Sequence, residues 1–180
     1  MKKNVFSFIA ALIMILLNAT GQNTTENKQI FLTKEFTSLS ELLSQFHGDV
    51  VYIDFWASWC SPCLNELKHD AELDDFFEKN KIIRLYIAVE RKTKSKEEKK
   101  LSINKWKTLV NNYNLTGYNY YTQKRSVFMN NVYKNVMGKL SLPRFVIVNK
   151  KGEIIVRKAK KPSQKKKLIK QLTNYLNKNR

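Results

Sequence analysis

The sequence contains few of the residues that interrupt a fold, with five glycines and three prolines among 180 residues. It has no internal repeat, and no stretch rich in proline, glycine and serine divides the chain. Hydrophobic residues make up 43% of the chain and aromatic residues 12%, which is typical of a globular protein and not of a disordered one. At this length we expect one well-packed domain.

Cysteine and histidine are also scarce: Cys60, Cys63, His47 and His69 are the complete set. A zinc site takes four such ligands, often from two Cys-x-x-Cys pairs, and the second pair is missing here. A copper-type site with three residues between its cysteines is unmatched as well. We therefore expect neither a metal nor an organic cofactor.

Residues 1–21 have the pattern of a secretory signal peptide. Met1–Lys3 is basic, an uncharged and mostly apolar run extends from Val5 to Leu17, and the small residues Ala19 and Gly21 precede the expected cleavage site. The apolar run is shorter than the roughly 20 residues of a membrane-spanning helix, and no cysteine follows it for lipid attachment. The sequence predicts a mature protein in the periplasm or elsewhere outside the cytoplasm, where disulfides persist. If uncleaved, the segment would anchor the protein to a membrane.

Acidic residues are outnumbered, 15 against 33 lysines and arginines, so the formal net charge is +18. Many of the basic residues fall in two hydrophilic runs, 91–100 and 157–167, which lack the interleaved aromatic residues that stack on nucleic-acid bases. We interpret these runs as solvated surface with a weak attraction to acidic surfaces, and we expect a monomer that binds no nucleic acid.

Alternating strand and helix patterns predict an α/β protein. The run Val50–Trp56 is almost continuously apolar, which indicates a strand covered on both faces at the centre of a sheet. A turn at 149–152 joins the last two strands as a hairpin, so the sheet is expected to be mixed. The predicted strands are 30–32, 50–56, 82–89, 118–122, 144–148 and 153–156, and the predicted helices are 38–46, 61–80, 103–113, 127–137 and 164–176.

Cys60 and Cys63 stand where the central strand gives way to a helix, with Pro62 in the first helical turn. The unpaired N–H groups and the dipole at a helix N-terminus stabilise a thiolate and lower the thiol pKa. We expect Cys60 to keep an exposed sulfur and act as the attacking nucleophile, and Cys63 to be more buried and act as the resolving thiol. A purely structural disulfide is the alternative, but so small a loop would constrain the unfolded chain little.

The segment 51–63, VYIDFWASWCSPC, resembles the active-site segment of the thioredoxin superfamily, whose signature is Trp-Cys-x-Pro-Cys. The predicted location and the long segment before Pro143 resemble the TlpA/ResA-like thiol-disulfide oxidoreductases in particular. This resemblance, over about residues 36–176, implies a thioredoxin-like α/β sandwich with a central mixed sheet and an inserted helix-strand element before a cis-proline. The chain then divides into a signal peptide (1–21), an N-terminal extension (22–35) and a thioredoxin-like domain (36–180) with an insertion at 91–140.

The resemblance also assigns roles by position. Asp54 matches a buried carboxylate that handles the proton of Cys63, because burial raises a carboxyl pKa; an ordinary hydrogen-bonded strand aspartate is the alternative. Leu142-Pro143 matches the cis-proline that presents backbone to substrate. Glu66 matches an active-site glutamate of the ResA-like branch, with a solvent-facing residue favoured by the helix dipole as the alternative.

Three further residues of the motif are assigned to the substrate-binding surface: Trp59, Ser61 and Pro62. Ser61 replaces the glycine of the commonest thioredoxin motif and is expected to tune the reduction potential. Lys68 stands where many relatives have a proline that kinks the helix, so the helix shape is expected to differ there.

The resemblance implies dithiol-disulfide exchange through a redox-active Cys60-Cys63 disulfide. Pro62 resembles the reductants of the superfamily, so we expect a reductase of protein disulfides that receives electrons from a membrane thiol donor of the DsbD/CcdA type. A disulfide isomerase or oxidase and a non-enzymatic secreted binding module remain alternatives, although the intact cysteine pair argues against the binding module. A peroxidase of the peroxiredoxin type shares the fold but not this motif. We also hypothesise that the insertion 91–140 helps to select substrate; solvated padding is the alternative.

Overall fold

The structure is a computed structural model that describes residues 28–138 and 141–178. The predicted signal peptide, 1–21, lies outside these residues, as does the first part of the predicted extension, 22–27. None of the helices in the described part of the chain combines the length and the apolar content needed to cross a bilayer.

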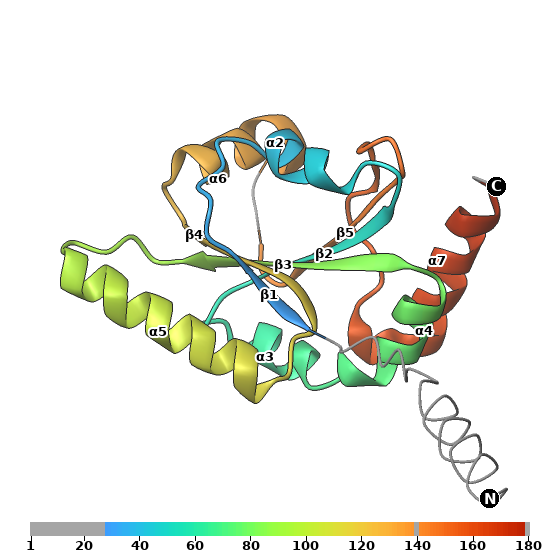
Figure 1. Cartoon of the computed structure of the whole chain (residues 1–180), viewed down its shortest axis with the longest axis horizontal. Helices are drawn as coiled ribbons and strands as arrows, with labels where there is room; N and C mark the ends of the chain where they lie inside the picture. Colours follow the sequence, from blue (N-terminus) through green and yellow to red (C-terminus); the bar gives the residue numbers. More distant parts are fainter. Residues whose placement is uncertain (1–27, 139–140, 179–180) are drawn as a thin grey trace, which may run out of the picture.

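A six-stranded mixed sheet forms the centre of the fold, in the order β1-β4-β3-β2-β5-β6 (Figure 1). β1, β4, β3 and β2 run parallel to one another, and β5 and β6 continue the sheet in antiparallel pairs. Every residue of β2 is buried, as its continuous apolar run predicts. The strands are β1 (Gln29–Leu32), β2 (Val50–Trp56), β3 (Ile82–Glu90), β4 (Gly117–Gln123), β5 (Arg144–Val148) and β6 (Ile154–Val156).

Helices cover both faces of this sheet (Figure 1). α2 and α6 pack on one face, where Ile53 and Phe55 of β2 point, while α3, α4, α5 and α7 pack on the other, where Tyr52 and Trp56 point. The α/β sandwich with a mixed sheet is therefore confirmed. The helices are α2 (Leu39–Leu43), α3 (Ser61–Leu67), α4 (Asp74–Lys79), α5 (Lys96–Asn112), α6 (Val127–Val132) and α7 (Lys165–Lys178), with short helical turns at η1 (Ser44–Phe46), η2 (Ala71–Leu73), η3 (Tyr133–Met137) and η4 (Pro162–Gln164).

The single helix predicted at 61–80 was wrong. α3 ends at Leu67, and the chain then passes through η2 into α4. The backbone bonds from His69 to Glu66 and from Asp70 to Leu67 span three residues instead of four, which tightens the helix and redirects it. This turn brings the carboxyl group of Asp70 into the core, where it accepts a hydrogen bond from the Tyr86 hydroxyl.

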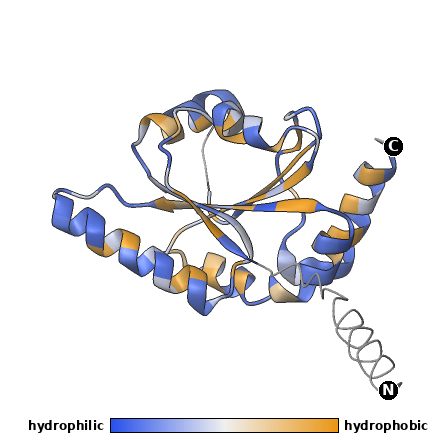
Figure 2. Cartoon of the chain, in the orientation of Figure 1, coloured by the Kyte–Doolittle hydropathy of each residue, from blue (hydrophilic) through white to orange (hydrophobic). Residues whose placement is uncertain are grey.

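The helix predicted at 103–113 begins earlier, at Lys96, because the start of α5 is capped and not buried. Ser95 accepts a hydrogen bond from the N–H of Glu98 at 3.1 Å, and the Glu98 carboxylate accepts one from the N–H of Lys94 at 2.7 Å. Most of α5 is hydrophilic (Figure 2), and only Trp106 and Val110 are buried. The apolar periodicity that marks a helix is therefore missing from its first turns.

The segments predicted as an extension and as an insertion both contribute strands to the sheet. β1 lies within 22–35 and pairs with β4, and β4 lies within 91–140 and pairs with both β1 and β3. The segment 91–140 is therefore built into the fold, and Arg91 and Lys124 follow directly after the neighbouring strands β3 and β4.

Candidate active site

Cys60 and Cys63 form a disulfide at the start of α3, directly after β2. Cys60 is the N-cap residue, Pro62 lies in the first turn, and the N–H of Cys63 donates to the Cys60 Sγ at 3.3 Å. Cys60 is 6% exposed and Cys63 1%, so Cys63 is the more buried of the two, as expected, although both residues are buried in the disulfide form. In this oxidised state both cysteines belong to the same buried apolar cluster as Leu67, Trp56 and Trp106.

Glu90 holds the loop that leads into Cys60. This residue ends β3, and its buried carboxylate accepts hydrogen bonds from the backbone N–H of Ser58 at 2.7 Å and from the Ser58 hydroxyl at 2.9 Å. The pairing of β2 with β3 places the end of β3 beside this loop. Sequence reasoning missed Glu90, although an acidic residue directly after the apolar run of β3 was a signal that could have found it.

Asp54 lies in the middle of β2, on the sheet face that α3 covers. Its side chain is 2% exposed, and within the described residues its Oδ1 has no hydrogen-bond partner. Burial raises the pKa of Asp54 well above its ordinary value of 3.8, and the negative charges of Asp70 and Glu66 raise it further. A carboxyl group with a raised pKa is a stronger base than an exposed aspartate, so it can accept a proton from a neighbouring group.

Glu66 is also buried, but it is turned toward the segment before α7. Its carboxylate accepts hydrogen bonds from the N–H of Ser163 at 3.0 Å and the Ser163 hydroxyl at 3.1 Å, and forms an ion pair with Lys161 at 2.7 Å. Burial alone would raise the pKa of Glu66, but these contacts from Lys161 and Ser163 outweigh it and lower the pKa below its ordinary value. The alternative of a solvent-facing glutamate is therefore wrong, because α3 packs against η4 and Glu66 is buried.

The peptide bond between Leu142 and Pro143 is cis, as the resemblance implies. Leu142 packs against the apolar cluster that contains both cysteines, and the pairing of Arg144 with Phe55 places Pro143 near the end of β2, which leads into the cysteine pair. Pro143 also lines a shallow hollow together with Arg144, Lys158 and Lys161.

The surface beside the disulfide is formed by the residues that were predicted to bind substrate. Ser61 and Pro62 are exposed, and Trp59 is 36% exposed. The guanidinium carbon of Arg91 lies 5.4 Å from the centre of the Trp59 ring, and the Nζ of Lys124 lies 5.5 Å from it. Both ends of the 91–140 segment's helix-strand unit therefore reach the surface next to Cys60.

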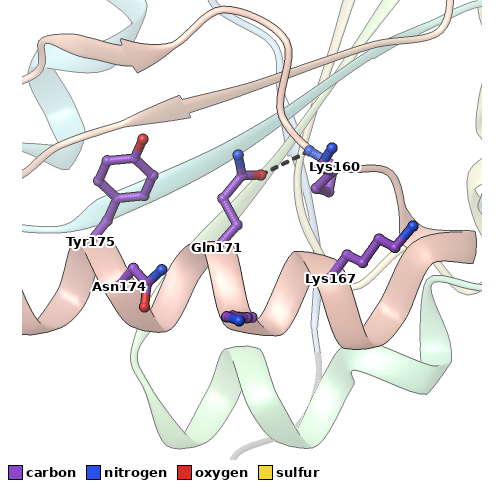
Figure 3. A pocket seen from close by; sticks show the side chains of 6 residues that line it. Lys160, Lys167, Gln171, Asn174 and Tyr175 are labelled. Carbon is purple, nitrogen blue, oxygen red and sulfur yellow. Dashed lines mark hydrogen bonds between the residues drawn. The ribbon is translucent and has the colours of Figure 1, made fainter.

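A second hollow, of about 400 Å³, lies along α7 (Figure 3). It is lined by Lys160, Lys167, Lys170, Gln171, Asn174 and Tyr175, and the N–H of Lys160 donates to the Gln171 side chain at 2.8 Å. None of these residues is a nucleophile of the cysteine type, and neither cysteine lines the hollow. We therefore assign the candidate active site to the cysteine pair.

The geometry around the disulfide agrees with comparisons to known proteins. The family model of Redoxin matches residues 32–175, which is most of the chain. The chain belongs to the Redoxin family. Its predicted membership of the thioredoxin superfamily, with a ResA/TlpA-like character, is confirmed.

Individual relatives of this Redoxin-family chain have related descriptions. It is 30% identical over 86 residues to the thiol-disulfide oxidoreductase ResA of Bacillus thuringiensis, which covers 41% of this chain and 50% of ResA. The thioredoxin domain of a thiol-disulfide oxidoreductase from Bacteroides vulgatus superposes with a TM-score of 0.57 at 17% identity, covering 74% of this chain and 84% of that one. A secreted disulfide oxidoreductase of Mycobacterium tuberculosis superposes with a TM-score of 0.50 at 17% identity, covering 71% and 85%.

These structural likenesses show the thioredoxin-like fold. The matches span about half the length of the curated relatives, from 42% to 59%. Among the residues that the structure describes, no group of three or more histidine, cysteine, aspartate or glutamate side chains is placed to hold a metal ion.

Proposed function

We propose that this Redoxin-family chain reduces disulfides of proteins outside the cytoplasm by exchange with the Cys60-Cys63 pair. The observation that carries the proposal is the disulfide itself, which joins the two cysteines of a Trp-Cys-x-Pro-Cys motif between a buried strand and a helix, beside a cis-proline. This disulfide is the oxidised form of the pair that would cycle between dithiol and disulfide.

In the first step, the reduced enzyme attacks. The Cys60 thiolate forms a bond to one sulfur of the substrate disulfide, and the other substrate sulfur leaves as a thiolate that takes up a proton. The N–H of Cys63, which donates to Cys60 Sγ in this structure, would stabilise the attacking thiolate. The backbone beside Pro143 would align the substrate chain.

In the second step, Cys63 resolves the mixed disulfide. Its thiol loses a proton, attacks the Cys60 sulfur and releases the second substrate sulfur as a thiol, so two electrons pass to the substrate and the Cys60-Cys63 disulfide forms. Asp54 is proposed to take the proton, because its raised pKa makes its carboxylate a better base than an exposed aspartate. A thiol donor must then reduce the enzyme again.

The proposed location rests on the N-terminal sequence and on a similar protein, and the proposed electron donor follows from that location. The pattern of residues 1–21 supports export, and the similar Mycobacterium tuberculosis protein is described as secreted. Electrons would then have to cross the membrane, which a thiol donor of the DsbD/CcdA type would provide. Proteins that carry disulfides are the proposed substrates.

The test is a trapping experiment in cells that produce the chain. Cys63→Ser leaves Cys60 able to attack but removes the resolving sulfur, so mixed disulfides with substrates should accumulate and be released by dithiothreitol. Cys60→Ser is the matched control, because it keeps one cysteine but lacks the proposed nucleophile. Mass spectrometry of the captured partners identifies the substrates. If Cys63→Ser captures nothing that Cys60→Ser does not, the proposal fails.

The direction of the reaction is tested by the reduction potential of the pair. A reductase should have a potential near that of thioredoxin, about −270 mV, whereas an oxidase should lie near that of DsbA, about −120 mV. Equilibration with glutathione buffers measures it. A value at the oxidising end would replace the reductase with the oxidase alternative.

A further inference from the structure

Three side chains form a cationic aromatic cluster beside the disulfide: Trp59, Arg91 and Lys124. Trp59 immediately precedes Cys60, and the two cations lie 5.4 and 5.5 Å from the centre of its ring. Arg91 follows β3 and Lys124 follows β4, which are neighbouring parallel strands, so the sheet brings together residues that are 33 positions apart. The backbone N–H of Lys124 also donates to the carbonyl of Glu90 at 2.8 Å, which fixes the two strand ends to each other.

The charge of this cluster is not neutralised within the described part of the chain. All three side chains are exposed, and neither Arg91 nor Lys124 takes part in a salt bridge there. The neighbouring acidic residue, Glu90, is buried and directs its carboxylate to Ser58. The cluster therefore presents positive charge to whatever approaches Cys60.

Positive charge also lies on the cis-proline side of the disulfide. The hollow beside Pro143 is lined by Arg144, Lys158 and Lys161 and by no acidic residue. Glu66, the acidic residue that pairs with Lys161, is buried. A segment of substrate that crosses the disulfide from the cis-proline to Trp59 would meet cations at both ends.

We propose that this surface selects protein substrates in which acidic residues flank the reacting cysteine, with Trp59, Arg91 and Lys124 as the recognition element. The inference rests on the proposed function, because the occupant must carry a disulfide to Cys60. Arg91 and Lys124 both lie over the Trp59 ring. An aspartate or glutamate of the substrate can therefore pair with either cation while the substrate backbone lies against the indole. Complementary charge of this kind mainly raises the rate of productive encounter.

The hypothesis that the segment 91–140 helps to select substrate is thereby narrowed to two of its residues, Arg91 and Lys124. β4 is an interior strand of the sheet, so replacing the whole segment by a turn would remove part of the core. The recognition element can instead be tested by substituting Arg91 and Lys124, the exposed residues that follow β3 and β4. The rest of the exposed surface of α5 is not needed for it.

The experiment uses three peptides with the same disulfide loop, flanked by two aspartates, two asparagines or two lysines. The full chain is reduced, freed of reductant and mixed with each peptide, and the second-order rate constant of peptide reduction is measured at low and high salt. We expect the aspartate peptide to react about 10-fold faster than the asparagine peptide at low salt and the lysine peptide to react more slowly than both, with the differences shrinking at high salt.

Substitutions assign this preference to the cluster. The double variant Arg91→Gln/Lys124→Gln should bring the aspartate-to-asparagine ratio close to 1. Lys107→Gln is the matched control, because Lys107 also lies over an aromatic ring, 5.8 Å from the centre of Phe31, on another part of the surface. That control should keep the full ratio.

The outcomes separate the two proposals. If the reduced chain reduces none of the peptides, the proposed function fails. If it reduces all three at equal rates, the proposed function stands and the acidic preference is overturned. If the preference survives in the double variant, it arises from the overall charge of the protein and the assignment to this cluster is overturned.

Discussion

Asp54 lies in the central strand β2, and Glu66 lies in α3, the helix that packs on the same side of the sheet. The resemblance placed both residues in the active site. Both are buried, at 2% and 7% exposure. Oδ1 of Asp54 has no hydrogen-bond partner among the described residues, whereas both oxygens of Glu66 are bonded, to Lys161 and Ser163. The pKa of Asp54 is consequently raised and that of Glu66 is lowered.

The difference shows that burial alone does not decide what a carboxyl group does. Burial disfavours the charged form of both groups, but donors that point at Glu66 compensate for it and keep that carboxylate ionised. A buried carboxyl group without such donors has a raised pKa and is therefore a stronger base. We therefore expect Asp54 to act in proton transfer and Glu66 to attach α3 to the segment before α7.

Asp70 is a third buried carboxyl group, with a raised pKa like Asp54 but with a hydrogen-bond donor like Glu66. Its titration is expected to give the largest change in stability. Burial raises its pKa from 3.8 to about 6, although the hydrogen bond from Tyr86 and the charge of Arg84 lower it. The folded protein thus binds this proton more tightly than the unfolded chain, so the stabilisation is complete below about pH 4 and is lost as the pH rises through about 6. We expect this group to lower the free energy of unfolding by about 2.5 kcal/mol between pH 4 and pH 7.

Urea unfolding of the oxidised protein between pH 4 and pH 7.5 measures this loss. Asp70→Asn keeps an oxygen that can accept from Tyr86 but cannot titrate, so the variant should lose less stability over this range than the unmodified chain. Asp54 also destabilises the fold as the pH rises, and the difference between the two curves removes its share. Parallel curves would contradict the raised pKa of Asp70.

Asp54→Asn is expected to slow the release of product from the mixed disulfide about 100-fold at pH 7, because it removes the proposed proton acceptor for Cys63. The initial attack by Cys60 should change little. Stability at pH 7 and above should stay the same or rise, because the amide carries no charge to bury. Rapid-mixing kinetics with a preformed mixed disulfide separates the two steps.

The exposed Asp75 provides the control for this substitution. Asp75→Asn removes one carboxyl from the same protein at a position on α4, and both steps should keep their rates. If Asp54→Asn resolves the mixed disulfide at the normal rate, a different base serves Cys63.

Glu66→Gln should show the opposite behaviour. The variant loses the ion pair with Lys161 and weakens the bonds from Ser163, so we expect a loss of about 2 kcal/mol in the free energy of unfolding, with disulfide exchange changed less than about twofold. Chemical unfolding and insulin reduction assays measure the two quantities. A variant that remained stable but lost exchange activity would instead support the catalytic role that the resemblance assigned to Glu66.

Much of the fold was predictable because its signals are local. The continuous apolar run of β2 indicated a central strand, and the motif between that strand and α3 indicated the cysteine pair. The cis bond before Pro143 followed from the resemblance. In each case the residues that carry the signal are neighbours in sequence.

The features that sequence reasoning missed depend on contacts between distant residues. Asp70, in the turn that follows α3, meets Tyr86 across 16 positions, and Glu66 meets Ser163 across 97. The periodicity of apolar residues within one helix or strand does not reveal a partner so distant in the sequence. The early start of α5 is a different kind of error, because Ser95 and Glu98 form a local capping signal that was available in the sequence.

Glu90 offers the smallest and most specific test of the comparison. Both of its carboxylate oxygens accept from Ser58, so its hydrogen-bonding capacity is used as in Glu66, whereas Oδ1 of Asp54 has no partner among the described residues. Ser58→Ala removes one of the two bonds and should lower the free energy of unfolding by about 1 kcal/mol, while Ser58→Thr, which keeps the hydroxyl, should restore most of it. Urea unfolding of the three proteins measures the effect. Because Ser58 lies two residues before Cys60, the same variants should shift the reduction potential slightly if the bond also positions the nucleophile; equal potentials would limit Glu90 to holding the loop.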